Sequence, residues 1–247
     1  MIHVASLIHD DVLDEAETRR GGAAVHTMYT NKVAVLAGDY LLARASVLLA
    51  RLQHLQVVEV MASALDFLVQ GEIMQARSKK EDLLDMNYYL RKSYMKTASL
   101  ICNSCKSSAL LSGFSEQDII TVSAEEFGYH LGMAYQIVDD ILDFTGASAQ
   151  LGKPAQADME LGLSTAPILY ASETVKEIRP LIQRRFKEPG DIQKAVSLAK
   201  ETDCVDKAYS LAEFHGQKAV DALMRFPESE YRLALMKLLH VCLSRDK

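Results

Sequence analysis

The feature that most constrains this sequence is a short acidic motif that occurs twice, each time after a run of apolar residues. The copies are HDDVLD, which follows IHVASLI, and DDILD, which follows GMAYQIV. Their acids are Asp10, Asp11, Asp14, Asp139, Asp140 and Asp143. At this spacing the acids lie close together on a helix, where like charges one turn apart destabilise it by about 0.2–0.5 kcal/mol per pair. A single triplet is also typical of a solvated helix end, but two identical ones in apolar helices indicate a cation site.

The ligand chemistry of the triplets favours magnesium. Acids at the end of apolar helices would be buried and unpaired unless cations compensated them. Mg²⁺ binds through one or two carboxylates and completes its shell with water and phosphate oxygens. Arg19 and Arg20 follow the first triplet and supply planar donors suited to phosphate. The sequence therefore predicts Mg²⁺ as cofactor and a phosphorylated substrate.

Apolar residues recur with helical periodicity along the chain, and no alternating run is long enough for a sheet. We expect an all-α fold in one domain spanning 1–247. The expected helices cover 1–18, 31–52, 55–78, 85–112 and 116–145, the last capped by Ser115. Amphipathic helices follow from 166, with breaks near Pro180, Pro189–Gly190 and Pro227.

Composition narrows the function classes. A hydrophobic content of 49% supplies a large core, and a net charge of −6 argues against a general nucleic-acid binder. No uninterrupted apolar run approaches the roughly 20 residues of a membrane span. Cys102 and Cys105 form a CxxC, but no second CxxC or nearby His pair completes a zinc site, so we interpret them as packing residues on a helix in a reducing compartment.

Two further motifs accompany the acids, namely the pair Lys96-Thr97 and the tripeptide Gly152-Lys153-Pro154. With both DDxxD motifs, they make the chain resemble the trans-isoprenyl diphosphate synthases over essentially its whole length. Within that family it is similar to the long-chain polyprenyl (solanesyl/decaprenyl) diphosphate synthases of quinone biosynthesis. The resemblance implies an isoprenoid-synthase helical bundle around a central cavity. It also implies a prenyltransferase that condenses isopentenyl diphosphate with an allylic diphosphate into a long all-trans chain, which would serve as the ubiquinone side chain.

The resemblance also implies roles for individual residues. Both triplets would hold Mg²⁺, Arg19 would contact the allylic diphosphate, and Arg20 would contact the isopentenyl diphosphate. The remaining contacts to the allylic diphosphate would come from Lys96, Thr97, Gln136 and Lys153. Ala5 and Ser6 precede the first triplet and are small, which in this family implies an open tunnel and a long product; the alternative is that they only allow close helix packing.

Three polar residues inside apolar helices have open roles. Asp39 could cap a neighbouring helix or lie behind the site, and we favour the structural role. Glu72 and Gln75 could hydrogen-bond to the metal-binding acids or could face solvent. For Glu72 and Gln75, the sequence does not decide between contact with the acids and exposure to solvent.

The chain departs from the family pattern in two places. The usual motif GKxT is Gly162-Leu163-Ser164-Thr165 here, so Leu163 replaces a cation, as also occurs in the mitochondrial-type long-chain members. Nothing matches the upstream motif GGKxxRP that helps to bind isopentenyl diphosphate, and we expect the chain to be a shortened form.

The resemblance further implies a homodimer or a heteromer with a related subunit, peripheral membrane association for product release, and a mitochondrial location, or otherwise a cytoplasmic one. No nucleic-acid partner is expected. The main alternative function is a non-catalytic or regulatory subunit of a heteromeric synthase, although the intact triplets disfavour it. A terpene cyclase is disfavoured by the second DDxxD, and a structural metal-binding bundle does not explain Arg19, Arg20, Lys96 and Lys153.

Overall fold

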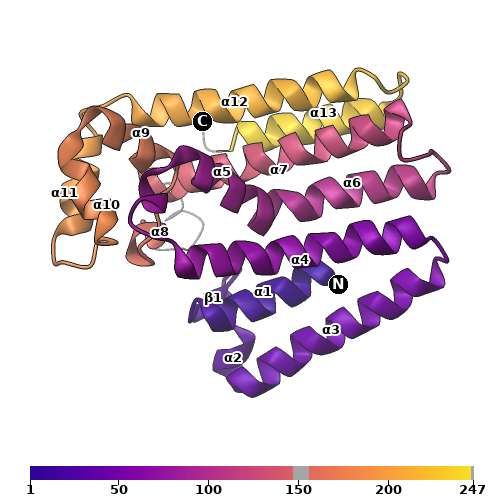
Figure 1. Cartoon of the computed structure of the whole chain (residues 1–247), viewed down its shortest axis with the longest axis horizontal. Helices are drawn as coiled ribbons and strands as arrows, with labels where there is room; N and C mark the ends of the chain where they lie inside the picture. The colour runs from indigo at the N-terminus through magenta and orange to yellow at the C-terminus, as the bar shows by residue number, and fades with distance from the viewer. Residues whose placement is uncertain (147–155, 246–247) are drawn as a thin grey trace. The chain divides into compact units, whose positions relative to one another are not determined.

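Helices account for most of the chain in the computed structural model, which describes residues 1–146 and 156–245 (Figure 1). The chain forms two compact units, Met1–Glu59 and Val60–Lys247. The boundary falls within helix α4, Leu55–Arg77. The predicted all-α class is confirmed, since the only sheet among the described residues pairs two strands of two residues each.

The first unit contains helix α1, a small hairpin, and two further helices. The elements are α1 Ile2–Leu13, β1 Thr18–Arg19, β2 Gly22–Ala23, α2 Val25–Met28 and α3 Asn31–Arg51. Helix α1 packs against α3. Helix α3 begins after Thr30, whose side chain accepts a hydrogen bond from the backbone N–H of Val33, as an N-cap residue does.

The predicted helix over 1–18 was too long, because the chain turns back on itself after the first triplet. Thr18 pairs with Ala23, and Arg19 pairs with Gly22, in an antiparallel hairpin. The two residues of the turn, Arg20 and Gly21, have φ of 53° and 78°. Positive φ at both positions is what a two-residue hairpin turn with matching strand twist requires. The helix itself ends at Leu13, where Glu15, with φ of 53°, takes the chain out of the helical conformation before the hairpin begins.

The second unit is built from helices of very different lengths. After α4 these are η1 Asp82–Leu84, α5 Met86–Ser93, η2 Tyr94–Ala98, α6 Ser99–Leu111, α7 Ile119–Thr145, α8 Ala157–Glu160, α9 Ala166–Thr174, η4 Lys176–Ile178, α10 Arg179–Gln183, α11 Asp191–Ala199, α12 Cys204–Leu223 and α13 Glu230–Leu243. The breaks predicted near Pro180, Pro189–Gly190 and Pro227 all separate observed helices.

Helix α7 is the central element of this unit, with α6, α12 and α13 packed along it (Figure 1). It buries a row of large side chains, including Ile137, Val138 and Ile141. The predicted cap Ser115 was wrong: Asp118 caps the helix, its Oδ1 accepting a 2.8 Å hydrogen bond from the backbone N–H of Ile120. Asp is as favourable as Ser at an N-cap, and here it is the carboxylate of Asp118 that meets a free backbone N–H group at the start of the helix.

The predicted helix over 85–112 is interrupted by one turn of π-helix, η2, between α5 and α6. Such turns insert an extra residue and are frequent at functional sites. This turn contains Lys96 and Thr97, the pair singled out from the sequence. It lies tightly against α7, because a Cβ at Gly132 would lie 2.6 Å from the Cα of Ala98. The close approach brings Thr97 beside the side chains of α7.

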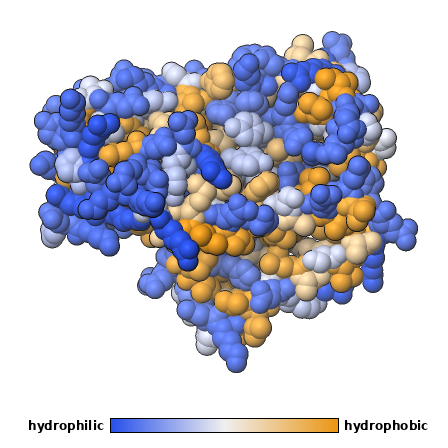
Figure 2. All heavy atoms as spheres, viewed as in Figure 1, coloured by the Kyte–Doolittle hydropathy of each residue, from blue (hydrophilic) through white to orange (hydrophobic). Residues whose placement is uncertain are grey.

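Helix α3 presents several apolar side chains to the outside. Its exposed residues include Val33, Val35, Leu36, Tyr40, Val47 and Leu48. Orange side chains gather over this helix at the lower edge of Figure 2. Among the described residues, α3 is also the one helix long and apolar enough to cross a membrane, although Asp39 and Arg44 interrupt the run.

Candidate active site

The first triplet lies at the end of α1, where its buried member is paired with an arginine. Asp11 is 3% exposed, and its Oδ1 accepts hydrogen bonds from Nε of Arg19, at 2.8 Å, and from Nη2 of the same side chain. Hairpin strand β1 carries Arg19 back to the helix end. Asp14 lies just beyond the helix, and its backbone N–H donates to the carbonyl of Asp10. Arg20, in the turn of the hairpin, is exposed.

Asp39, whose role the sequence left open, lies beside the residue that precedes the triplet. Nε2 of His9 is 3.1 Å from the carbonyl oxygen of Val35 and 3.6 Å from Oδ1 of Asp39. Both contacts suit a proton on Nε2 of His9. Asp39 therefore helps to orient the side chain next to Asp10, and no hydrogen bond from it to a helix N-terminus is seen in the described part of the chain.

The second triplet centres on Asp140, which is 3% exposed and held by two neutral donors. The phenol of Tyr89 donates to Oδ2 at 2.6 Å, and Nε2 of Gln136 donates to Oδ1 at 2.7 Å. Burial raises the pKa of Asp140 well above its ordinary value, and the charge of Asp158 raises it further. The hydrogen bonds from Tyr89 and Gln136 and the charge of Lys92 act in the opposite direction. Asp140 is thus a buried acid with two neutral hydrogen-bond donors and a nearby positive charge, Lys92, that forms no ion pair with it among the described residues.

Thr97 extends this network by one more hydrogen bond. Its hydroxyl donates to Oε1 of Gln136 at 2.6 Å, so the amide of Gln136 must present its NH₂ group to Asp140. The chain of contacts Thr97–Gln136–Asp140–Tyr89 joins the π-turn, α7 and α5. Three of the residues expected to form one site, Thr97, Gln136 and Asp140, are therefore brought together.

Lys96, the partner of Thr97 in the motif, is held from α4. Its Nζ lies 2.6 Å from Oε1 of Glu72 and donates to Oε1 of Gln75 at 3.2 Å. Glu72 and Gln75 thus contact the lysine and not the acids of the triplet. This arrangement is neither of the two that the sequence left open. The α4 pair positions a lysine of the site and neutralises it.

The other two acids of the second triplet point to different partners. Asp143 accepts the backbone N–H groups of Ala157 and Asp158, at 3.0 and 3.2 Å, and so caps α8. The side chain of Asp139 is 47% exposed, and its Oδ1 lies 4.0 Å from Nη1 of Arg245. Among the described residues, no three His, Cys, Asp or Glu side chains are arranged to hold a metal ion. The binding of a metal ion by the two triplets therefore stays a prediction.

This arrangement still fits a divalent cation that takes few ligands from the protein. Mg²⁺ needs only one or two carboxylates when phosphate oxygens and water complete its shell. Asp140 has no ion pair among the described residues, and a bound cation would favour its charged form against the effects of burial and of Asp158. The exposed carboxylate of Asp139 is adjacent in sequence. Asp139 and Asp140 are thus the donors best placed to bind such an ion in this unit.

Several other predicted residues have a definite position. Ala5 is fully buried and Ser6 is 7% exposed, and the hydroxyl of Ser6 donates to the carbonyl of His3 at 2.9 Å. Lys153, with Gly152 and Pro154, lies outside the described residues. The cysteines of the CxxC are free thiols on α6, as predicted, and burial raises the pKa of Cys102 to about 12 and that of Cys105 to about 11.

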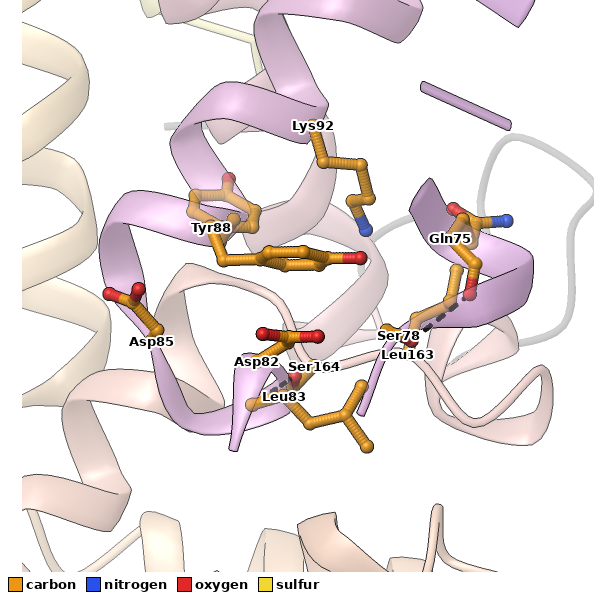
Figure 3. Close-up of a pocket in the computed structure, with 10 residues that line it drawn as sticks. Gln75, Ser78, Asp82, Leu83, Asp85, Tyr88, Lys92, Leu163 and Ser164 are labelled. Carbon is orange, nitrogen blue, oxygen red and sulfur yellow. Dashed lines mark hydrogen bonds between the residues drawn. The ribbon is translucent and has the colours of Figure 1, made fainter. Parts of the chain in front are cut away.

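Sequence reasoning missed three residues near Asp140, namely Tyr89, Lys92 and Asp158. Tyr89 and Lys92 precede Lys96 by two turns and one turn, so the helical spacing could have indicated them. Burial lowers the pKa of Lys92, while the charges of Asp140, Asp158 and Glu72 raise it. Lys92 also lines a small pocket with Gln75, Tyr88 and Leu163 (Figure 3).

The sequence and fold are those of a known family. Residues 1–199 match the family described as Polyprenyl synthetase. A decaprenyl-diphosphate synthase of Dictyostelium discoideum is 47% identical over 247 residues, which are 100% of this chain and 53% of that protein. A probable mitochondrial hexaprenyl pyrophosphate synthase of Neurospora crassa is 46% identical over 255 residues, 100% of this chain and 56% of the relative. The chain thus spans about half the length of these relatives.

A solved structure agrees with the sequence relatives. The crystal structure of a polyprenyl synthase from Caulobacter crescentus, complexed with calcium and isoprenyl diphosphate, superposes with a TM-score of 0.89 at 32% identity. The match covers 100% of this chain and 76% of that one. The matched residues, the sequence identity and the fold together show that this chain belongs to the polyprenyl synthetase family.

Proposed function

We propose that this chain is the catalytic part of a Mg²⁺-dependent trans-polyprenyl diphosphate synthase. It would condense isopentenyl diphosphate with an allylic diphosphate and make a long-chain all-trans product for the ubiquinone side chain. The observation that carries the proposal is the state of Asp140, a buried carboxylate with neutral hydrogen-bond donors and an acidic neighbour. A site built this way is completed by a cation. The names of the relatives and the calcium and isoprenyl diphosphate of the Caulobacter structure support the same chemistry.

The residues of the chain would divide the work between binding and orientation. Asp139 and Asp140, with Asp10 and Asp11 of the first unit, would hold the metal. Bound Mg²⁺ supplies charge that neutralises the diphosphate as the carbon–oxygen bond of the allylic substrate breaks. The hydrogen bonds from Thr97 through Gln136 would hold the carboxylate of Asp140 in one orientation. A fixed orientation matters because such charges accelerate the reaction only when they are aligned beforehand.

The cationic side chains would bind the diphosphates. Lys96 contacts Glu72 and Gln75 with two of its three N–H groups. The third N–H group could donate to a diphosphate. Arg19 and Lys153 would contact the allylic diphosphate, and Arg20 would bind isopentenyl diphosphate. An allylic cation reacts with water, so the apolar surroundings of the triplets would protect it. Ala5 and Ser6 would leave room for a long product.

Assembly and location complete the proposal. The exposed apolar residues of α3 would pack against a second polyprenyl synthase chain, either a copy of this one or a related subunit. A mitochondrial location is proposed because the Neurospora relative is named as mitochondrial. Peripheral contact with a membrane would allow an apolar product to leave.

The experiment is a metal-dependent condensation assay on the purified chain. Farnesyl diphosphate and radiolabelled isopentenyl diphosphate are incubated with the protein, and pyrophosphate and labelled prenyl product are measured with Mg²⁺ and with excess chelator. We expect both products to form with Mg²⁺ and to disappear with chelator. Absence of metal-dependent product, both for the chain alone and with an active synthase subunit added, would contradict catalysis. Increased activity of the added subunit in that case would instead support a regulatory role.

A further inference from the structure

Lys92 is a cation of the second unit that has no ion-pair partner among residues 1–146 and 156–245. It lies on α5, one turn before Lys96, and its side chain is half-buried. Within the described part of the chain it makes no hydrogen bond and no ion pair. Figure 3 shows its amine pointing into a pocket on the side of Gln75. An ammonium in such a position has three donors to satisfy, and leaving them unmet is costly.

The acids around Lys92 do not need it as a hydrogen-bond donor. Glu72 already forms an ion pair with Lys96 at 2.6 Å. Both oxygens of Asp140 accept hydrogen bonds, one from Tyr89 and one from Gln136. Lys92 is nevertheless close enough to Asp140 for their charges to interact. An anion bound beside Asp140 would therefore come within reach of the Lys92 amine.

The same pocket has an apolar residue at one position where a charge would be expected, and its two acids, Asp82 and Asp85, accept backbone N–H groups of Lys79 and Asn87. Leu163 lines it together with Lys92, and the usual family motif has a lysine at the position of Leu163. The backbone around Leu163 is firmly held: its N–H donates to the carbonyl of Asp158 at 2.9 Å, and the hydroxyl of Ser164 donates to the carbonyl of Leu83 at 2.6 Å. A lysine placed at either position would extend into one shared pocket.

We propose that Lys92 supplies the positive charge that the family motif normally places at the position of Leu163, and that it binds the diphosphate group of the allylic substrate. This inference rests on the proposed function and adds one substrate-binding residue to it. It also accounts for the loss of the motif lysine without loss of phosphate contacts, because the charge reaches the pocket from α5 instead of from the loop before α9.

The test exchanges the charge between the two positions and measures binding of inorganic pyrophosphate with Mg²⁺ by calorimetry. The variants are Lys92→Gln, and the double variant Lys92→Leu with Leu163→Lys. Arg91→Gln is the matched control, because it removes a positive charge from an exposed neighbour on the same helix. We expect Lys92→Gln to weaken binding about 10- to 100-fold, the range for a lost hydrogen bond to a charged group. The double variant should recover binding to within about threefold of the parent chain, and the control should not change it.

Three outcomes separate the possibilities. Equal pyrophosphate binding by the parent and Lys92→Gln would overturn the inference, as would a folded double variant that fails to recover binding. A parent chain without any Mg²⁺-dependent pyrophosphate binding would instead contradict the proposed function. Thermal unfolding without ligand distinguishes a structural role: if Lys92 serves only to offset neighbouring acids, Lys92→Gln unfolds at a lower temperature but binds pyrophosphate as the parent does.

Discussion

The two acidic triplets have nearly the same sequence but opposite electrostatic environments. In the first, buried Asp11 has a positively charged partner in Arg19. In the second, the donors to buried Asp140 among the described residues are neutral, and Asp158 is a nearby acid. The comparison teaches that a motif fixes which ligands are available, whereas its surroundings decide whether they are charge-compensated before a ligand binds.

The difference arises from the chain segment that comes after each triplet. After the first, a hairpin with a two-residue turn returns the chain within a few residues and places Arg19 on Asp11. The second lies in the last turns of α7, among helices that bury it from several sides, and α8 begins on the side chain of Asp143. The first triplet is therefore paired within its own segment. In the second, we propose that a bound cation compensates the charge.

The largest expected effect comes from removing one acid of either triplet. If both bind metal, Asp10→Ala and Asp139→Ala should each lower the rate of pyrophosphate release by about 10³-fold or more, since metal stabilisation of developing charge is worth several kcal/mol. Circular dichroism should show an unchanged helical fold. Asp206→Ala, on the exposed side of α12, is the control and should keep the parent rate. A parent-like rate in one triplet variant alone would mean that only the other triplet takes part.

The second comparison concerns the alanine five residues before each triplet. Ala5 and Ala134 are both fully buried, on α1 and α7. If Ala5 lines the product tunnel, Ala5→Phe should shift labelled products toward short chains while the first condensation continues. Ala134 lies in the packed core of α7, where an added ring should destabilise the fold by about 1–3 kcal/mol without shortening the product.

Chromatography of the labelled products and thermal unfolding are measured on both variants. Unaltered product lengths in a folded Ala5→Phe variant would place the end of the tunnel elsewhere. A loss of stability in Ala5→Phe equal to that in Ala134→Phe would show that Ala5 serves helix packing, the alternative that its small size leaves open.

The sequence predicted the long helices well because their apolar periodicity is sustained. The predicted ranges 31–52 and 55–78 differ by one residue from the observed α3 and α4. It failed where short-range chemistry overrides periodicity: α1 ends at Leu13 and a hairpin with its turn at Arg20-Gly21 follows, and the π-turn at Lys96-Thr97 is invisible in a hydrophobic pattern. Both exceptions lie among the residues proposed to bind substrate.

The sequence identified many residues of the candidate site but did not predict the contacts between them. Spacing identified Thr97, Gln136 and Asp140, yet their hydrogen bonds depend on how closely the π-turn approaches α7. The partnership of Lys96 with Glu72 joins segments whose contact no local pattern encodes. Tyr89, which donates to Asp140, was missed because a buried tyrosine in a helix is more often interpreted as core.

The smallest expected effect is on the unfolding temperature of the chain without divalent metal. It tests the comparison of the two triplets directly. Burial raises the pKa of Asp140, so the folded state holds its proton more tightly than the unfolded state does. As pH rises above the ordinary pKa of an aspartate, the unfolded state is therefore increasingly favoured. Asp140→Asn removes this effect and keeps partners for Tyr89 and Gln136. It should raise the unfolding temperature at neutral pH by about 2–4 °C, or about 1 kcal/mol for a chain of this size.

Asp11→Asn should have the opposite sign, because it replaces the charge-assisted hydrogen bonds from Arg19 with neutral ones, and it should lower the unfolding temperature by a similar amount. The stabilising effect of Asp140→Asn should shrink as the pH falls toward 4, where Asp140 is increasingly protonated in the folded and unfolded states alike. Added Mg²⁺ should stabilise the parent chain more than Asp140→Asn. If both variants shifted the unfolding temperature in the same direction at neutral pH, the contrast between a paired and an uncompensated triplet would be wrong.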